Sequence, residues 1–143
     1  MSRIDKTNSA IGVFRAPSNI AWNATSGPSG VTDLDRVIVV ALNGSGRIIK
    51  ATTAVSAVGI VIAHKPFAVG DPIDIITNGE VVELSAADIQ GATNPTAGTK
   101  YYFDATASRL SATAPIAANI GFYVGTTVEA GRLVVRCGQA GAL

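Results

Sequence analysis

Short apolar runs, separated by Gly, Asn and Pro, predict a chain built of β-strands. The clearest stretch is residues 58–84, VGIVIAHKPFAVGDPIDIITNGEVVEL. Its pattern indicates strands over 58–62, 73–77 and 80–84. Asn78 and Gly79 suit the two central positions of a type I′ turn, because both positions need a positive φ. We therefore expect a tight hairpin between the second strand and the third.

The remaining pattern extends this architecture. Residues 37–42 are continuously apolar, which is typical of a strand buried on both faces. Ser85 and Asp88 have the spacing of a capping box, so one or two helical turns at most are expected there. Further strands are expected over 47–53, 100–104, 109–112, 120–126 and 132–137. The prediction is an all-β fold, an antiparallel small barrel or sandwich of about nine strands with at most one short helix.

The first 30 residues differ from the rest because they are rich in Ser, Asn, Gly and Pro. Their apolar islands are costly to leave in water, although the polar residues around them cannot build a core. We expect an extended N-terminal arm over 1–30 that docks either on its own domain or on a neighbouring subunit, followed by a β-domain over 31–143. The arm residues expected to contact a neighbouring subunit are Arg3, Ile11, Val13, Phe14, Arg15, Ile20 and Trp22.

Charged residues make up 15% of the chain, against about 25% in a typical soluble domain. A surface so poor in charge indicates that another protein covers part of it, so we expect an oligomer or a component of an assembly. The net charge is +1 without any Lys/Arg block, which argues against binding to nucleic acid. Neither a membrane span nor an apolar signal segment after Arg3 and Lys6 is found. We expect synthesis in a cytoplasm.

Few residues carry reactive chemistry. His64 ends a strand without a nucleophile or carboxylate arranged beside it, so a solvated loop histidine is expected rather than an acyl-transfer base. Cys137 lies in an apolar run and is expected to be a buried structural thiol. Gly44-Ser45-Gly46 opens no helix and lacks a dinucleotide fingerprint. The candidate metal ligands are Asp33, Asp35, Asp71 and Asp74, which lack the EF-hand pattern. We expect neither an enzyme nor a cofactor or metal site.

Aromatic residues cluster in one strand. Tyr101 and Phe103 share a strand face and Tyr102 takes the other, so at most a small sugar-stacking platform is available. We expect core packing to be their main role.

The order of strands and turns resembles that of small all-β head decoration (capsid cement) proteins of tailed bacteriophages. The resemblance covers roughly residues 35–137 and leaves the arm outside. It is carried by Ala68-Val69-Gly70-Asp71-Pro72-Ile73, the Asn78-Gly79 pair with Val81-Val82, Ala97-Gly98-Thr99-Lys100-Tyr101-Tyr102, Leu110-Ser111 and Ile120-Gly121.

The resemblance implies a non-enzymatic virion protein on the capsid exterior. Such a protein binds and bridges major capsid protein subunits, often as a trimer or dimer, and resists the pressure of packed DNA. An extended arm suits this role because it can pair with an exposed strand edge of another subunit. The alternative is a phage tail or fibre module that binds a host glycan or surface protein.

Overall fold

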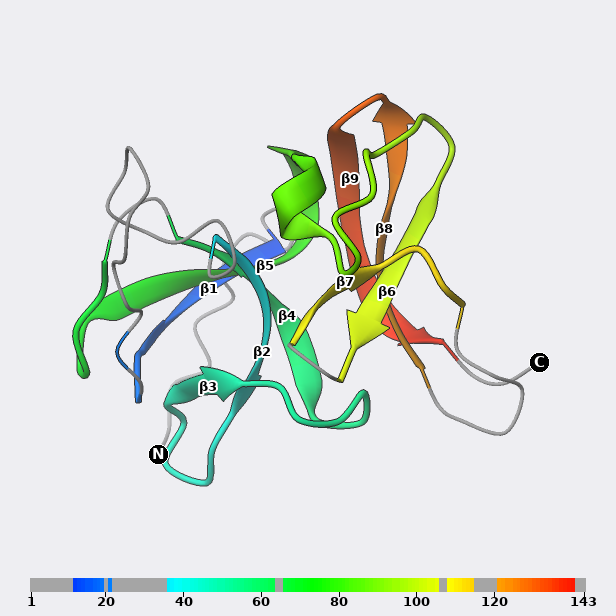
Figure 1. The fold of residues 1–143 in the computed structure, drawn as a ribbon. Helices are drawn as coiled ribbons and strands as arrows, with labels where there is room; N and C mark the ends of the chain where they lie inside the picture. The colour runs from blue at the N-terminus through cyan, green and yellow to red at the C-terminus, as the bar shows by residue number, and fades with distance from the viewer. Residues whose placement is uncertain are drawn as a thin grey trace.

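The computed structural model describes residues 12–19, 21, 36–63, 66–105, 108–114 and 121–140. Within these residues nine strands form one antiparallel sheet, curled into a half-barrel (Figure 1). The helical element that they contain is one 3₁₀ turn, Ala86–Asp88. The predicted all-β fold is therefore confirmed, including its short helix.

The strands are spread along the described residues, with connections that range from a tight turn to long segments. In chain order they are β1 (Gly12–Pro17), β2 (Val37–Leu42), β3 (Ile48–Lys50), β4 (Ala57–Ile62), β5 (Pro72–Glu83), β6 (Lys100–Asp104), β7 (Arg109–Ser111), β8 (Gly121–Glu129) and β9 (Arg132–Ala140). Their order in the sheet is β3-β2-β4-β5-β9-β8-β6-β7, with β1 paired to β5. The curl brings the β7 end back to β2, where Val39 N donates to Ser108 O at 2.8 Å.

Strand β2 is buried on both faces, as its continuous apolar sequence predicts. Val37 and Val39 face a first core, whereas Ile38 and Val40 face a second core on the other side of the sheet. The first core gathers side chains from β2, β4, β5, β6, β7, β8 and β9, including Ile60, Val82, Leu84, Ile89, Tyr101, Leu110, Phe122, Val124, Leu133 and Val135. The second core is formed mainly by Ala16, Ile48, Val61, Ala63, Phe67, Ile73 and Ile75 together with β2.

The hairpin predicted at Asn78 and Gly79 is wrong. Strand β5 continues through both residues and changes its partner there, from β1 in its first half to β9 in its second. Gly79 has a φ of 88°, and the register against β9 shifts between Asn78 and Val81. These are the features of a glycine bulge, in which one extra residue is absorbed without reversing the strand. Positive φ at glycine serves a bulge as readily as a turn.

The other predicted boundaries need smaller changes. Strands 37–42 and 100–104 match the structure, while the strand predicted over 47–53 is confined to β3. The final hairpin turns later than predicted, because β8 continues to Glu129. The last strand, β9, continues beyond its predicted end at Cys137.

The predicted capping box starts the 3₁₀ turn. Ser85 N donates to Asp88 Oδ2 at 2.6 Å, and Asp88 N donates to Ser85 O at 3.1 Å. The Asp88 side chain is buried and is held by Arg36, whose Nε donates to Asp88 Oδ1 at 2.9 Å. This ion pair ties the start of β2 to the turn that follows β5, as a buried carboxylate requires.

Candidate interaction surfaces

Strand β1 lies beside the first half of β5 within the same chain. Its register places Arg15 opposite Asp74 and Ala16 opposite Ile73. Ala16 is buried in the second core, so β1 contributes to the packing of the domain. Beyond Pro17 the chain stays attached, because Ser18 N donates to Asp71 O at 2.8 Å.

Arg15 and Asp74 form an exposed ion pair across these two strands. Arg15 Nε donates to Asp74 Oδ1 at 2.7 Å, and the two side chains are 65% and 51% exposed. The hydrogen bond from Arg15 lowers the pKa of the Asp74 carboxyl, and the positive charge of Arg15 acts in the same direction. Asp74, a candidate metal ligand by sequence, is therefore engaged by a cation of its own chain.

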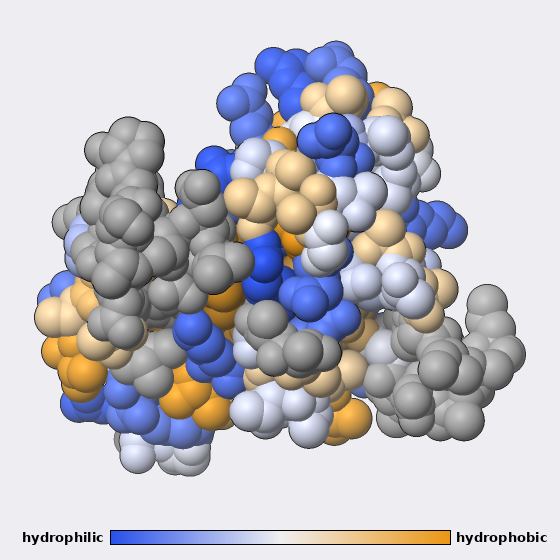
Figure 2. All heavy atoms as spheres, viewed as in Figure 1, coloured by the Kyte–Doolittle hydropathy of each residue, from blue (hydrophilic) through white to orange (hydrophobic). Residues whose placement is uncertain are grey.

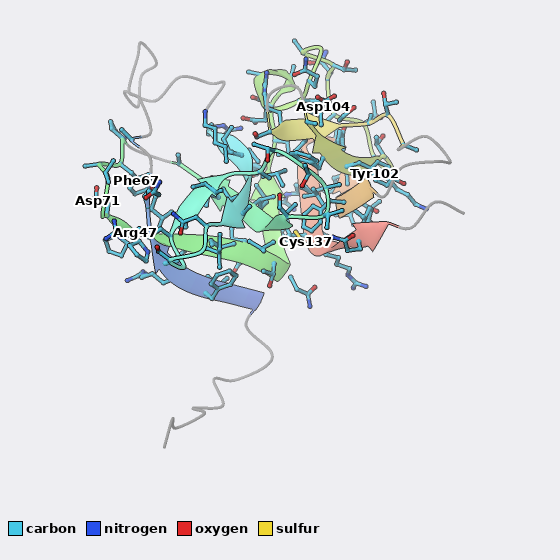
Figure 3. All side chains as sticks on the ribbon, turned by 90° about the horizontal axis from the view of Figure 1, so that it is seen from below. Arg47, Phe67, Asp71, Tyr102, Asp104 and Cys137 are labelled. Atoms are coloured by element: carbon cyan, nitrogen blue, oxygen red, sulfur yellow. The ribbon has the colours of Figure 1, made fainter. Side chains whose placement is uncertain are left out.

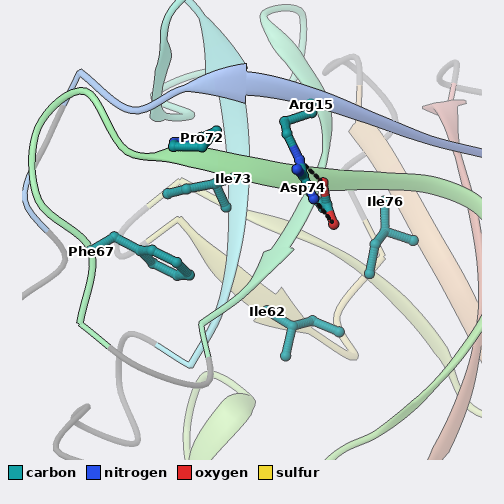
Figure 4. A pocket seen from close by; sticks show the side chains of 7 residues that line it. All are labelled: Arg15, Ile62, Phe67, Pro72, Ile73, Asp74 and Ile76. Carbon is teal, nitrogen blue, oxygen red and sulfur yellow. Dashed lines mark hydrogen bonds and ion pairs between the residues drawn. The ribbon is translucent and has the colours of Figure 1, made fainter.

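A pocket of about 360 Å³ lies beneath this ion pair (Figure 4). Its walls present polar and apolar surface in about equal parts, and the apolar side chains come from β4, β5 and the segment before β5. Arg15 and Asp74 form a charged rim on one side. The remaining lining residues are Ile62, Phe67, Pro72, Ile73 and Ile76. We call this site the β1 pocket.

Three residues of the predicted contact set lie on β1. Val13 is half-buried, Phe14 is 39% exposed, and Arg15 is exposed at the pocket rim. The structure thus places Arg15, but neither Val13 nor Phe14, in the lining of the β1 pocket. The other four predicted residues, Arg3, Ile11, Ile20 and Trp22, lie outside the described residues.

A second surface covers the outer side of the second half of β5, of β9 and of β8. Cross-strand pairing puts Val81 beside Val134, and Val134 beside Thr126. Val81 is 57% exposed, and Val128 on β8 is 59% exposed. The alternate residues of β9, such as Leu133, point into the first core instead. We call this apolar outer surface the β9 face.

The β9 face is hollowed and carries charge at both ends. A groove of about 290 Å³ is lined by Tyr123, Thr126, Val128, Val134 and Arg136. Tyr123 Oη and Thr126 Oγ1 are hydrogen-bonded within it. Arg136 is exposed and forms no ion pair within the described part of the chain.

The opposite end of the β9 face is mainly acidic. Glu83 lies beside Arg132 across β5 and β9, and Glu129 lies beside Arg132 across β9 and β8. Arg132 Nη1 is 3.5 Å from Glu129 Oε2. This end therefore holds two carboxylates against one guanidinium.

The aromatic strand divides as its alternation predicts. Tyr101 is buried in the first core and Phe103 packs against that core, which confirms their packing role. Tyr102 lies on the other face, with its ring 5.7 Å from that of Tyr123 at an interplanar angle of 61°. Because this contact is edge-to-face, the two rings do not form a flat stacking platform.

The residues with reactive chemistry have structural partners where they are described. Burial raises the pKa of the Cys137 thiol to about 12, and its Sγ lies 3.9 Å from the carbonyl oxygens of Ile76 and Val124. Cys137 packs against the first core, as predicted for a structural thiol. Asp71 caps its own turn, because Ala68 N donates to Asp71 Oδ2 at 2.8 Å.

Other candidates from the sequence are not brought together. His64, Asp33 and Asp35 lie outside the described residues. Across the described ranges, no cluster of three or more His, Cys, Asp or Glu side chains is arranged to hold a metal ion. None of the helical structure described is long and apolar enough to cross a membrane.

The two surfaces lie at different ends of the molecule. Phe67 and Asp71, beside the β1 pocket, lie at one end, and Tyr102 lies toward the other (Figure 3). Apolar residues reach the surface in several separate places on the side drawn in space-filling form (Figure 2). Sequence alternation identified exposed positions along single strands, but it could not show which of them share a surface.

Comparison with known proteins gives a likeness of fold. No protein family matches the sequence, and no curated protein matches it. A solved structure from Mycobacterium phage Patience superimposes with a TM-score of 0.63 over 97% of both chains, at 18% sequence identity. The chain is therefore similar in fold to a bacteriophage protein along almost its whole length.

Proposed function

We propose that the chain is a structural virion protein of a tailed bacteriophage, made in the host cytoplasm. It binds the outer surface of the capsid and stabilises the shell by bridging neighbouring major capsid protein subunits. The observation that carries this proposal is the β1 pocket, which has apolar side chains in its walls and a charged rim to which the predicted contact residue Arg15 contributes. The likeness of fold to a phage protein and the low charge content of the chain support it.

The β1 pocket suits the capture of one apolar side chain from the capsid protein. Its volume of about 360 Å³ is at the lower end of the range of small-molecule pockets, and the apolar side chains in its walls favour a side chain that leaves water on binding. Arg15 and Asp74 offer hydrogen bonds at the rim, which fix the orientation of the bound segment. Binding by one such anchor per contact is compatible with many copies acting together on a shell.

Cosedimentation with capsids of its own phage, prepared without this protein, tests the proposal. We expect the full chain to cosediment, and we expect Pro72→Trp to weaken binding by about tenfold or more, since an exposed rim residue then fills the pocket. Val55→Trp is the matched control, because Val55 is 66% exposed and does not line the pocket. Failure of the unmodified chain to bind the capsid would exclude the function.

The same assay distinguishes two failures: the β1 pocket being the wrong contact site, or capsid binding being the wrong function. If Pro72→Trp binds as tightly as the unmodified chain, the capsid contact lies elsewhere on the molecule. If the chain ignores capsids but binds host glycans, and Tyr102→Ala abolishes that binding without unfolding the protein, the tail or fibre alternative holds.

A further inference from the structure

The β9 face has a regular arrangement of charged and apolar cross-strand rows. The middle row contains Val81 and Val134. On β9, Arg132 and Arg136 lie two residues to either side of Val134. The acidic end with Glu83 therefore lies on one side of the valines, and the basic end with Arg136 lies on the other.

We propose that the β9 face is a two-fold contact between two copies of this chain. A two-fold axis in the plane of contact passes between Val81 and Val134 and is tilted from the middle row, so that each copy is turned end over end relative to the other. The valines of the two copies then meet at the centre, and the tilt brings Arg136 of each copy to Glu83 of its partner rather than to the partner's Arg132. Such a contact is isologous, since the same patch serves both subunits. This inference concerns self-association and goes beyond the proposed capsid binding.

At the basic end of the β9 face the charge is unpaired within the described part of the chain, whereas Arg132 at the other end is paired with Glu129. Arg136 forms no ion pair in the described residues, although it lies in a groove with the exposed Val128. Arg15, by contrast, is already paired with Asp74 in its own chain. An exposed cation beside two exposed valines indicates a partner that supplies both a carboxylate and apolar surface.

Charge complementarity favours a second copy over a uniformly acidic partner. An acidic partner broad enough to cover the face would pair with Arg136 but would meet Glu83 and Glu129 at the other end. Like charges brought together across an interface are unfavourable. A second copy presents the opposite sign at each end, so a single surface satisfies both.

Sedimentation velocity of the purified full chain tests the apolar centre of the contact. We expect dimers that dissociate at least tenfold more readily in Val81→Asp, because Val81 lies in the middle row and two carboxylates are then buried near the axis. Val55→Asp is the matched control: Val55 is also exposed but lies off the face, so its variant should dimerise normally. Circular dichroism of each variant checks that the fold is retained.

A charge-swap series tests the symmetry of the contact. Arg136→Glu and Glu83→Lys should each weaken the dimer by about tenfold, since each places like charges opposite one another. The double variant Arg136→Glu/Glu83→Lys should recover the dimer, because both ends are then reversed in both copies. This recovery in one chain would show that Arg136 of one copy lies opposite Glu83 of another, and sedimentation at the mass of a dimer without larger species would show that the contact is closed and two-fold. Raising the salt concentration should weaken the unmodified dimer.

Either of two results would overturn the inference. One is a protein that remains monomeric up to about 1 mM. The other is a dimer whose dissociation is unchanged by Val81→Asp and by the charge-swap series, which would place the contact elsewhere. Loss of capsid binding on Val81→Asp in a monomeric chain would assign the β9 face to the capsid instead. A monomer that still binds capsids would remove the two-fold contact and leave the proposed function intact.

Discussion

The two halves of β5 carry surfaces that differ in whether their charged side chains are paired within the chain. In the first half, Asp74 is paired with Arg15 of the neighbouring β1, and the pair borders the β1 pocket. In the second half, Val81 lies exposed beside β9, and Arg136 has no ion-pair partner in the described chain. The Gly79 bulge separates the two halves.

The difference between them indicates different roles. Where the chain completes its own ion pair, the charge helps to hold two strands together and leaves the nearby hollow for an apolar guest. Where the charge is left open beside exposed valines, another molecule can supply the complement. This difference is why we propose the first surface for capsid capture and the second for self-association.

Removing β1 should have the largest effect on stability, because the first of the two surfaces depends on this strand. Deletion of residues 1–17 strips Ala16 and the strand that covers Ile73 and Ile75, so we expect the free energy of unfolding to fall by about 3–5 kcal/mol. Urea denaturation measures this loss. Deletion of residues 1–11 keeps every paired residue of β1 and is the control. Equal stability of the two truncated chains would show that β1 adds nothing to the fold.

Neighbouring residues on β9 separate core from surface. Leu133→Ala opens a cavity in the first core and should cost about 2–5 kcal/mol in urea denaturation. Val134→Ala, one residue later on the outer face, should cost less than about 1 kcal/mol. Only the second variant should change dimer dissociation without a large change in stability. Similar stability losses in both would contradict the assignment of the outer face.

The glycine bulge that separates the two halves gives a smaller effect. Gly79→Ala should destabilise the protein by about 1–2 kcal/mol, because a side chain at a φ of 88° is strained even in open space. Gly44→Ala is the control, since a Cβ at that turn meets nothing within 4 Å and its φ is not positive. If both substitutions are neutral in a thermal melt, the backbone at Gly79 has relaxed to another form.

Acid should weaken the ion pair in the first half of β5, and the resulting loss of thermal stability is the smallest effect that we predict. The pKa of Asp74 is lowered in the folded chain, so its contribution is complete above the unfolded value of about 4 and is lost as the pH falls through the folded value. Thermal melts across pH 2–5 should therefore show a shallower acid dependence for Asp74→Asn. Glu80→Gln removes an exposed acid outside the pair and should leave the profile unchanged.

Local pattern predicted local structure well. The apolar run 37–42 gave both the bounds and the double burial of β2, and alternation in 100–104 placed Tyr101 in the core. It failed at Asn78 and Gly79, because a positive φ does not distinguish a bulge from a hairpin. That distinction depends on partners far along the chain: β1 before the bulge and β9 after it.

The candidate surfaces could be predicted from the sequence less well than the strands. Arg15 was predicted as a contact residue, but its pairing with Asp74 arises only when β1 lies on β5. Val81, Val128 and Arg136 are scattered along the sequence and share a surface only because β5, β9 and β8 are adjacent. Alternation shows that each of them points outward, but not which residues stand beside it.

The contact between the β7 end of the sheet and β2 affects how many strand edges are open to other molecules at high protein concentration. Free strand edges recruit edges of other chains into open-ended ribbons. Here the two ends of the sheet order are the short strands β3 and β7, and the bond from Val39 N to Ser108 O occupies part of the β2 edge between them. Fewer backbone groups are thereby open to strands of other molecules at this part of the sheet, so we expect β1, which pairs only with β5 among the described strands, to be the more exposed edge at high protein concentration.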